Sequence, residues 1–179
     1  MQENFIRTFE GPLNKNQTKI LVKEFNSIEN KANLKLNLDG SDMGQTAYIE
    51  SATEAEKVLV EFTSRIIGEY ILDLGVPYHF KSMMDEGYQI QRWDATSPHW
   101  LSTVDETAPN KVLQVLMVLQ AKKGASIKFR HHGEIPLTAG TTLVFPALYT
   151  HSYMLNPVAA KGIYLISTGV RTILETEEE

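Results

Sequence analysis

The strongest evidence for the fold class lies in residues 134–170, EIPLTAGTTLVFPALYTHSYMLNPVAAKGIYLISTGV. It contains two runs rich in β-branched and aromatic residues, Thr141–Pro146 and Gly162–Val170, a composition typical of β-strands. Turn residues such as Gly140 bound these runs. A histidine, His151, follows the first run after a short turn. The stretch therefore predicts two strands, with a candidate functional side chain at the turn between them.

The same pattern extends upstream to about Gly87. Short β-branched or aromatic runs recur there between turn residues, at Tyr88–Trp93, Val112–Gln120 and Ala125–Arg130. The run VLQVLMVL, residues 112–119, is apolar on both faces. It therefore predicts a central strand, covered by helix on one side and by another sheet on the other.

Two amphipathic helices are predicted before these strands. Asn14 and Gln17 form a capping-box pattern ahead of a helix that runs to about residue 30. Ser51 and Glu54 form a second such pattern, and Gly75 stands where the residue after a helix belongs, which predicts a helix over about 52–73. Two helices followed by an antiparallel sandwich or barrel give an α+β fold class.

Composition limits the classes of function. The chain has 179 residues and a net charge of −5, and we expect one domain over 1–174, with a helical brace to about 75, a β core over about 87–171 and an acidic tail at 175–179. Zero cysteines exclude thiolate metal sites and cysteine nucleophiles, so any metal must bind through His, Asp or Glu. Without a Lys/Arg block, a signal peptide or a long apolar stretch, we expect a cytoplasmic protein with neither nucleic acid nor membrane as a general partner.

The order of motifs over about residues 87–170 resembles the iron(II)/2-oxoglutarate-dependent oxygenases, particularly their prolyl-4-hydroxylase-like group in bacteria and phages. The family pattern of an apolar strand ending in Phe-Pro, a short turn, a metal-ligand histidine and a Pro-Val pair stands here as Phe145-Pro146, His151 and Pro157-Val158. The resemblance implies a double-stranded β-helix, a jelly-roll or cupin-like barrel braced by N-terminal helices. It also implies Fe(II) as cofactor and 2-oxoglutarate as co-substrate.

The metal ligands implied by this resemblance leave three alternatives. The family uses two histidines and an acid placed two residues after the first histidine, but Leu101 stands in the acid's place after His99. In the first alternative the loop brings Asp105 to the metal, and the triad is His99, Asp105 and His151. In the second, Thr103-Val104-Asp105 aligns with the motif and the metal site is damaged. In the third, two histidines act without a carboxylate, an arrangement that admits halide in some family members.

The co-substrate side rests on one basic residue. In the family such a residue, about ten positions after the distal histidine, pairs with the far carboxylate of 2-oxoglutarate. Lys161 stands ten residues after His151. A loop with one fewer residue would place Ile163 there instead, and Arg92 and Arg171 are fallback cations.

Other candidate side chains have simpler interpretations. His131 and His132 are adjacent, and since neighbouring strand residues point to opposite faces, we interpret the pair as a hairpin loop and not as a metal pair. The aromatic residues near the predicted barrel mouth fit either pocket lining or packing: Trp93, Trp100, Tyr149 and Tyr153.

The resemblance implies a dioxygenase that hydroxylates a small-molecule or peptide substrate, which the sequence does not identify. A homodimer is left open. Two alternatives from other classes stand beside this prediction. One is a catalytically silent module of the same fold, used for binding or structure, and the other is a cupin-like metal protein without 2-oxoglutarate dependence.

Overall fold

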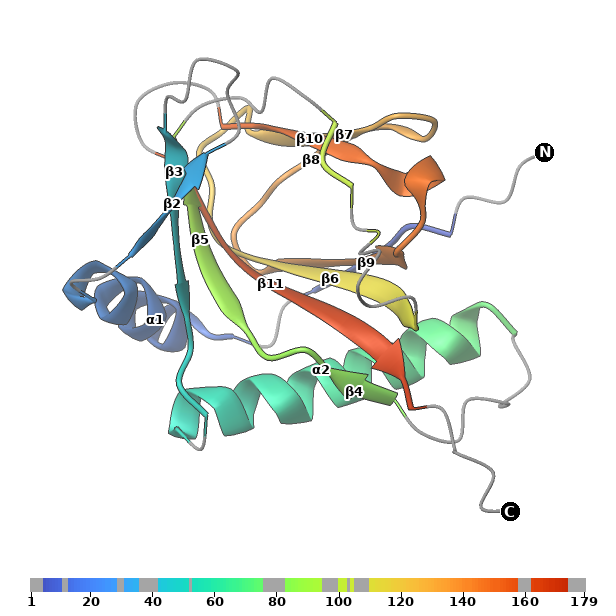
Figure 1. Ribbon diagram of the computed structural model, residues 1–179, viewed down its shortest axis with the longest axis horizontal. Helices are drawn as coiled ribbons and strands as arrows, with labels where there is room; N and C mark the ends of the chain where they lie inside the picture. Colours follow the sequence, from blue (N-terminus) through green and yellow to red (C-terminus); the bar gives the residue numbers. More distant parts are fainter. Residues whose placement is uncertain are drawn as a thin grey trace.

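The fold consists of two helices and two antiparallel sheets arranged in three layers (Figure 1). The computed structural model describes residues 5–10, 13–28, 31–35, 42–51, 53–75, 83–94, 100–102, 104, 110–157 and 162–173. Within these ranges no helix has the length and apolar character needed to cross a membrane.

The large sheet has eight strands in the order β1-β9-β6-β11-β5-β3-β2, with β4 pairing with β11. The strands of this sheet are β1 (Arg7–Glu10), β2 (Ala32–Lys35), β3 (Asp42–Tyr48), β4 (Met83–Asp85), β5 (Gln89–Trp93), β6 (Lys111–Gln120), β9 (Thr141–Pro146) and β11 (Ile163–Thr172). The small sheet has the order β10-β7-β8, from β7 (Ser126–Phe129), β8 (Gly133–Pro136) and β10 (Tyr153–Asn156). A 3-10 turn, η1 (Tyr149–His151), connects β9 to β10.

The helices α1 (Lys15–Ser27) and α2 (Glu54–Asp73) begin at side-chain caps. The predicted capping box of α1 is confirmed, since the Asn14 side chain accepts from the Gln17 backbone N–H and the Gln17 side chain accepts from that of Asn14. The predicted cap of α2 at Ser51 is wrong. Thr53 caps this helix, and its hydroxyl accepts from the Glu56 N–H at 3.2 Å. Gly75 follows the helix with φ of +62°, the left-handed conformation expected after a helix end.

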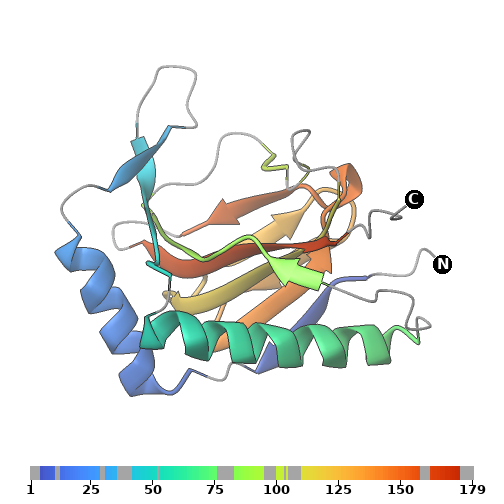
Figure 2. The same ribbon diagram turned by 60° about the horizontal axis from the view of Figure 1, so that its bottom comes forward.

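Both helices cover the same face of the large sheet (Figure 2). The apolar side of each helix packs on alternate residues of the central strands, and β6 contributes Leu113, Val115, Met117 and Leu119 to this core. A second core lies between the large and small sheets, where β6 contributes Leu116 and Val118. Strand β6 is therefore buried on both faces, by helix and by sheet, which confirms the prediction made from VLQVLMVL.

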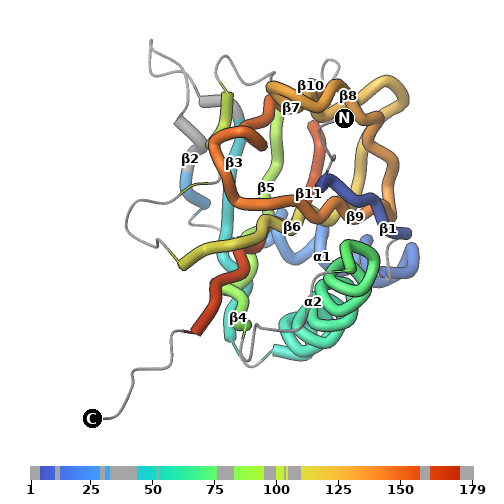
Figure 3. The backbone as a smooth tube through the Cα atoms, turned by 90° about the vertical axis from the view of Figure 1, so that its right-hand side faces the viewer, coloured from blue at the N-terminus to red at the C-terminus, as the bar shows by residue number. Residues whose placement is uncertain are grey.

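The small sheet lies opposite the helices, as Figure 3 shows for β7, β8 and β10 on one side of the large sheet and α2 on the other. We call the space between the two sheets the inter-sheet core. It contains Phe129 and Tyr153 from the small sheet, and Trp93 and Ile163 from the large sheet. On β6 the side chains of residues 113–119 alternate between the helix face and this core, apart from the polar Gln114.

The N-terminal region is less helical than the predicted brace. Strands β1, β2 and β3 come from it and extend the large sheet at both edges. The sequence of β3 is rich in polar residues, so its hydrophobic pattern is weak. Gly44 is required there, because a Cβ at this position would stand 1.9 Å from the carbonyl oxygen of Arg92 on β5.

Candidate active site

His151 is the predicted metal ligand that the structure describes. It ends η1, directly before β10, and its side chain is buried with 3% exposure. Its Nδ1 lies 3.1 Å from the hydroxyl oxygen of Thr150, and its Nε2 has no hydrogen-bond partner among the described residues. When Nδ1–H donates to Thr150, the Nε2 lone pair is left to accept a hydrogen bond or to bind a metal ion.

The other predicted site residues, His99, Asp105 and Lys161, lie outside the described residues. Their roles therefore stay predictions. Thr103, from the alternative alignment, lies outside them as well.

A histidine that sequence reasoning assigned to a simple hairpin contacts this site. His131 and His132 lie in the turn between β7 and β8, as predicted. The His132 ring stacks on the His151 ring, with centroids 4.6 Å apart and planes at 22°. The His132 Nε2 is also buried without a partner among the described residues. The sequence carried no signal for this contact, because it depends on β7 and β10 being neighbours in the small sheet.

Both stacked imidazoles are neutral at physiological pH. Burial, followed by the charges of His132 and His131, lowers the pKa of His151 to about 4. Burial and the charge of His131 also lower the pKa of His132. A neutral imidazole is the form that binds metals, so burial keeps His151 in the form that a ligand requires.

This lowered pKa predicts an acid-sensitive fold. His151 binds its proton less readily in the folded state than in the unfolded state, where its pKa is about 6.5. The stability from the neutral ring is thus complete above pH 6.5 and is lost as the pH falls toward 4. We expect wild-type protein with chelator to lose about 2 to 3 kcal/mol more unfolding free energy than His151→Gln between pH 7 and pH 4.5. Denaturant unfolding at both pH values measures this, and equal losses in the two proteins would contradict it.

A backbone bridge brings the segment after His99 to the start of β10. The N–H of Leu101 donates to the carbonyl oxygen of Tyr153 at 2.7 Å, and the N–H of Tyr153 donates to the carbonyl oxygen of Leu101 at 3.0 Å. Such a reciprocal pair places the two Cα atoms about 5.5 Å apart. Leu101 is two residues from His99, and Tyr153 is two residues from His151. The bridge therefore places Leu101 beside Tyr153, with the two chains running in opposite directions.

The interior next to this bridge is aromatic. The buried Tyr153 ring lies 5.7 Å from the Phe145 ring and 6.1 Å from the Phe129 ring, and the two phenylalanines are 4.9 Å apart. Burial raises the pKa of Tyr153, so its phenol stays protonated. Tyr153 therefore packs in the inter-sheet core, whereas Tyr149 is exposed.

A line of polar side chains continues from this core along β5. The indole Nε1–H of Trp93 donates to Gln91 Oε1 at 3.1 Å, and Gln91 Nε2 donates to Gln89 Oε1 at 3.2 Å. Gln89 Nε2 in turn donates to the Tyr48 hydroxyl at 2.9 Å. Because residues 89, 91 and 93 alternate to one face, the amides share the face of the buried Trp93. We call these side chains the β5 polar ladder.

The sequence offers three other positions for the basic residue that would bind 2-oxoglutarate: 92, 163 and 171. None of them brings a positive charge into the inter-sheet core. Ile163, at the start of β11, is completely buried there, and Leu165 follows on the same face. Arg92 alternates to the helix face with Ile90. Arg171 lies at the far end of β11, where it pairs with Met84 of β4. Among the described residues no group of three His, Asp or Glu side chains could hold a metal.

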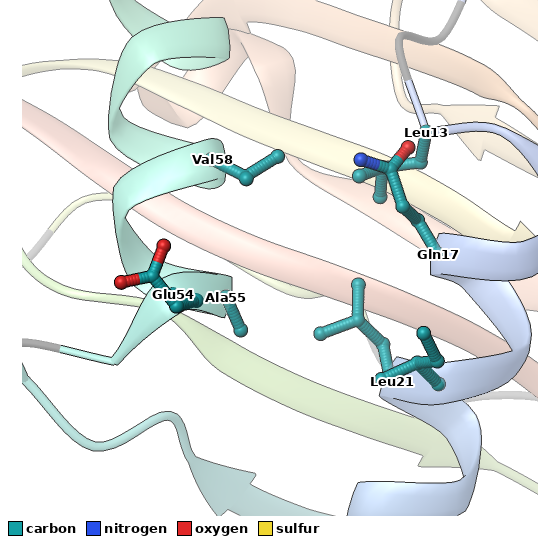
Figure 4. Close-up of a pocket in the computed structure, with 7 residues that line it drawn as sticks. Leu13, Gln17, Leu21, Glu54, Ala55 and Val58 are labelled. Carbon is teal, nitrogen blue, oxygen red and sulfur yellow. The ribbon is translucent and has the colours of Figure 1, made fainter.

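A separate apolar groove lies between the two helices (Figure 4). It has a volume of about 190 Å³, and apolar side chains of α1 and α2 face each other across it, with a glutamine and a glutamate at its sides: Leu13, Gln17, Leu21, Glu54, Ala55 and Val58. The large sheet separates this groove from His151. It is therefore a feature of the helix layer and not part of the candidate active site.

Comparison with known proteins identifies the fold. No family model matches the chain, and no curated protein matches its sequence. The viral collagen prolyl hydroxylase of Paramecium bursaria Chlorella virus-1, solved with 2OG, is similar in structure with a TM-score of 0.70 and 13% identity, over 96% of this chain and 97% of that chain.

Two bacterial structures are also similar. A prolyl-4-hydroxylase from Pseudomonas putida has a TM-score of 0.63 and 9% identity, over 94% of this chain and 93% of that chain. A 2OG-Fe(II) oxygenase family oxidoreductase from Burkholderia pseudomallei has a TM-score of 0.60 and 12% identity, over 86% of this chain and 78% of that chain. The chain therefore has the fold of prolyl hydroxylases and 2OG-Fe(II) oxygenases. At these identities the similarity establishes the fold alone.

Proposed function

We propose that this chain is an iron(II)/2-oxoglutarate-dependent dioxygenase on a double-stranded β-helix, and that it hydroxylates a substrate still to be identified. The observation that carries the proposal is the Leu101–Tyr153 bridge, because it joins the two segments on which the proposed ligands lie. Because the bridge is antiparallel, the chain that continues after Leu101 heads toward the His151 side of Tyr153, so the bridge supports Asp105 more directly than His99.

His151 fits the metal that this function requires. Its ring is neutral, and its buried Nε2 lacks a partner among the described residues. A buried nitrogen without a partner is costly, and a metal–nitrogen bond would remove that cost. We assign His99 and Asp105 as the other two ligands and Lys161 as the cation for 2-oxoglutarate. Bound iron and 2-oxoglutarate would supply the oxidising chemistry that hydroxylates the substrate.

The described side chains would shape the surroundings of the reaction. The rings of Phe129, Phe145 and Tyr153 fill the inter-sheet core next to the Leu101–Tyr153 bridge and would exclude water from that side of the site. The β5 polar ladder presents amides and a hydroxyl on the same face of the sheet, and these uncharged groups would orient polar atoms of the substrate.

A 2-oxoglutarate shift of the melting temperature tests this function. With anaerobic Fe(II), ligand at about 100 times its dissociation constant adds about 2.7 kcal/mol of stability, which is about 5 to 11 °C for this size of protein. We expect Lys161→Ala to remove most of the shift and to keep the iron, because the lysine would contact only the organic acid. Asp105→Ala should weaken iron binding. Scanning calorimetry and metal analysis measure both effects.

A second candidate function is a catalytically silent binding module. The observation that favours it is the apolar start of β11, where Ile163 and Leu165 face the inter-sheet core. The same experiment separates the candidates. Iron without a 2-oxoglutarate shift would favour a cupin-like metal protein, and absence of both would favour the silent module.

A further inference from the structure

A polar cavity lies on the helix face of the large sheet, away from His151. Arg92 on β5, Tyr164 on β11 and Gln120 on β6 stand in register on neighbouring strands, because Tyr164 pairs with both of the others. Side chains of directly opposed residues share a face, with Cβ atoms about 4.5 to 5.5 Å apart. The Tyr164 ring meets the Phe25 ring of α1 at 5.8 Å, edge to face. All three side chains therefore point toward α1.

Helix α1 forms one wall of this open cavity. Val22 and Asn26 lie one turn apart on the helix, and the other residues that line the cavity are Arg92, Asp94, Gln120, Gly162 and Tyr164. The cavity has a volume of about 350 Å³. Ligand sites for small molecules begin at about 300 Å³, so this cavity has room for a compact molecule.

One edge of the Arg92 guanidinium is fixed by a hydrogen bond to Asp94. Its Nε–H donates to Asp94 Oδ2 at 2.8 Å. Partial burial acts to lower the pKa of Arg92, but the hydrogen bond and charge of Asp94, with a contribution from Tyr164, outweigh it and raise the pKa. Within the part of the chain that the structure describes, no second carboxylate pairs with Arg92. The planar guanidinium has another pair of N–H groups, in the fork geometry that matches a carboxylate.

We propose that this cavity, the Arg92 pocket, binds a small molecule that carries a carboxylate on a compact apolar body. Arg92 supplies the fork for the carboxylate, and the amides of Asn26 and Gln120 and the Tyr164 hydroxyl supply further hydrogen bonds. Val22 supplies apolar contact. The sheet separates the Arg92 pocket from the inter-sheet core, so this proposal does not depend on the proposed dioxygenase activity.

Benzoate and benzamide are a matched pair of probes, since they share a ring and differ in the charge of the head group. We expect saturable benzoate binding to the full chain by calorimetry at low salt, with benzamide at least about 10-fold weaker, a difference of about 1.4 kcal/mol. Arg92→Gln should weaken benzoate binding by a similar factor. The control Arg65→Gln should leave it unchanged, because Arg65 is an exposed arginine of α2 beside Glu69. His151→Gln should also leave it unchanged.

Tyr164→Phe keeps the ring that packs on Phe25 and removes only the hydroxyl. We expect this variant to weaken benzoate binding about 2- to 10-fold, as for one lost hydrogen bond, with unchanged circular dichroism. Equal binding of both probes would overturn the proposal. Unchanged benzoate affinity in folded Arg92→Gln would also overturn the proposal. The same holds if wild-type protein binds no benzoate at about 10 mM, because a site with a dissociation constant of about 1 mM would be mostly occupied at that concentration.

Discussion

Replacing His151 with alanine is expected to lower the proposed Fe(II)-dependent 2-oxoglutarate turnover by at least about 100-fold. Groups that only orient a metal ligand already contribute about 10- to 100-fold to affinity or activity, and a ligand contributes more. The buried His151 Nε2, which has no partner among the described residues, is the atom whose loss causes the effect. Succinate formation in air and iron content after anaerobic loading measure the two consequences separately.

The matched control is His131→Ala. His131 is exposed in the β7–β8 turn next to His132, so its removal takes away an imidazole close to the site without removing the proposed ligand. We expect iron content and turnover of His131→Ala to stay within about 2-fold of wild type, as for an exposed residue with little effect on stability. Full iron content in folded His151→Ala would rule out His151 as a ligand. It would not by itself rule out the proposed dioxygenase activity.

Replacing Phe129 with alanine is expected to destabilise the fold by about 3 to 5 kcal/mol, which corresponds to about 6 to 20 °C in melting temperature. Phe129 is buried with 1% exposure, and its ring packs on those of Phe145 and Tyr153. Its removal leaves a cavity between the sheets that neighbouring strands cannot fill, because each strand is held by its ladder. Differential scanning calorimetry of metal-free protein measures the shift.

Leu72→Ala provides the comparison for Phe129→Ala. Leu72 lies on α2 with 71% exposure, so the same kind of truncation should cost no more than about 0.5 kcal/mol. A destabilisation of Phe129→Ala as small as that of Leu72→Ala would show that the small sheet does not pack on the large one in solution.

Local signals in the sequence determined several elements correctly. The periodicity and capping residues of α1, the end of α2 at Gly75 and the doubly apolar β6 each depend on interactions within one element or on burial of a whole segment. The His131-His132 turn also followed from the alternation of strand side chains. These features can be predicted because they depend on interactions between residues that are close in sequence.

Strand β3 shows where such signals end. Its polar sequence carries no clear alternation, yet it pairs with β5 because Gly44 lets the backbone of Arg92 approach closely. The cap of α2 is Thr53 and not the predicted Ser51. Both residue types can cap a helix, and the sequence alone does not fix which of two neighbouring candidates does so.

Local patterns were enough to predict the α+β class, the two helices, the central strand and His151 as the leading ligand candidate. Which side chains meet depends on how the strands pair. The tertiary structure stacked His132 on His151, packed Tyr153 into the inter-sheet core and turned Arg92 toward α1. The physical reason is that these contacts join strands far apart in the chain. A shift of one residue in register exchanges the two faces of a strand, so the face of each side chain follows from strand pairing and not from local composition.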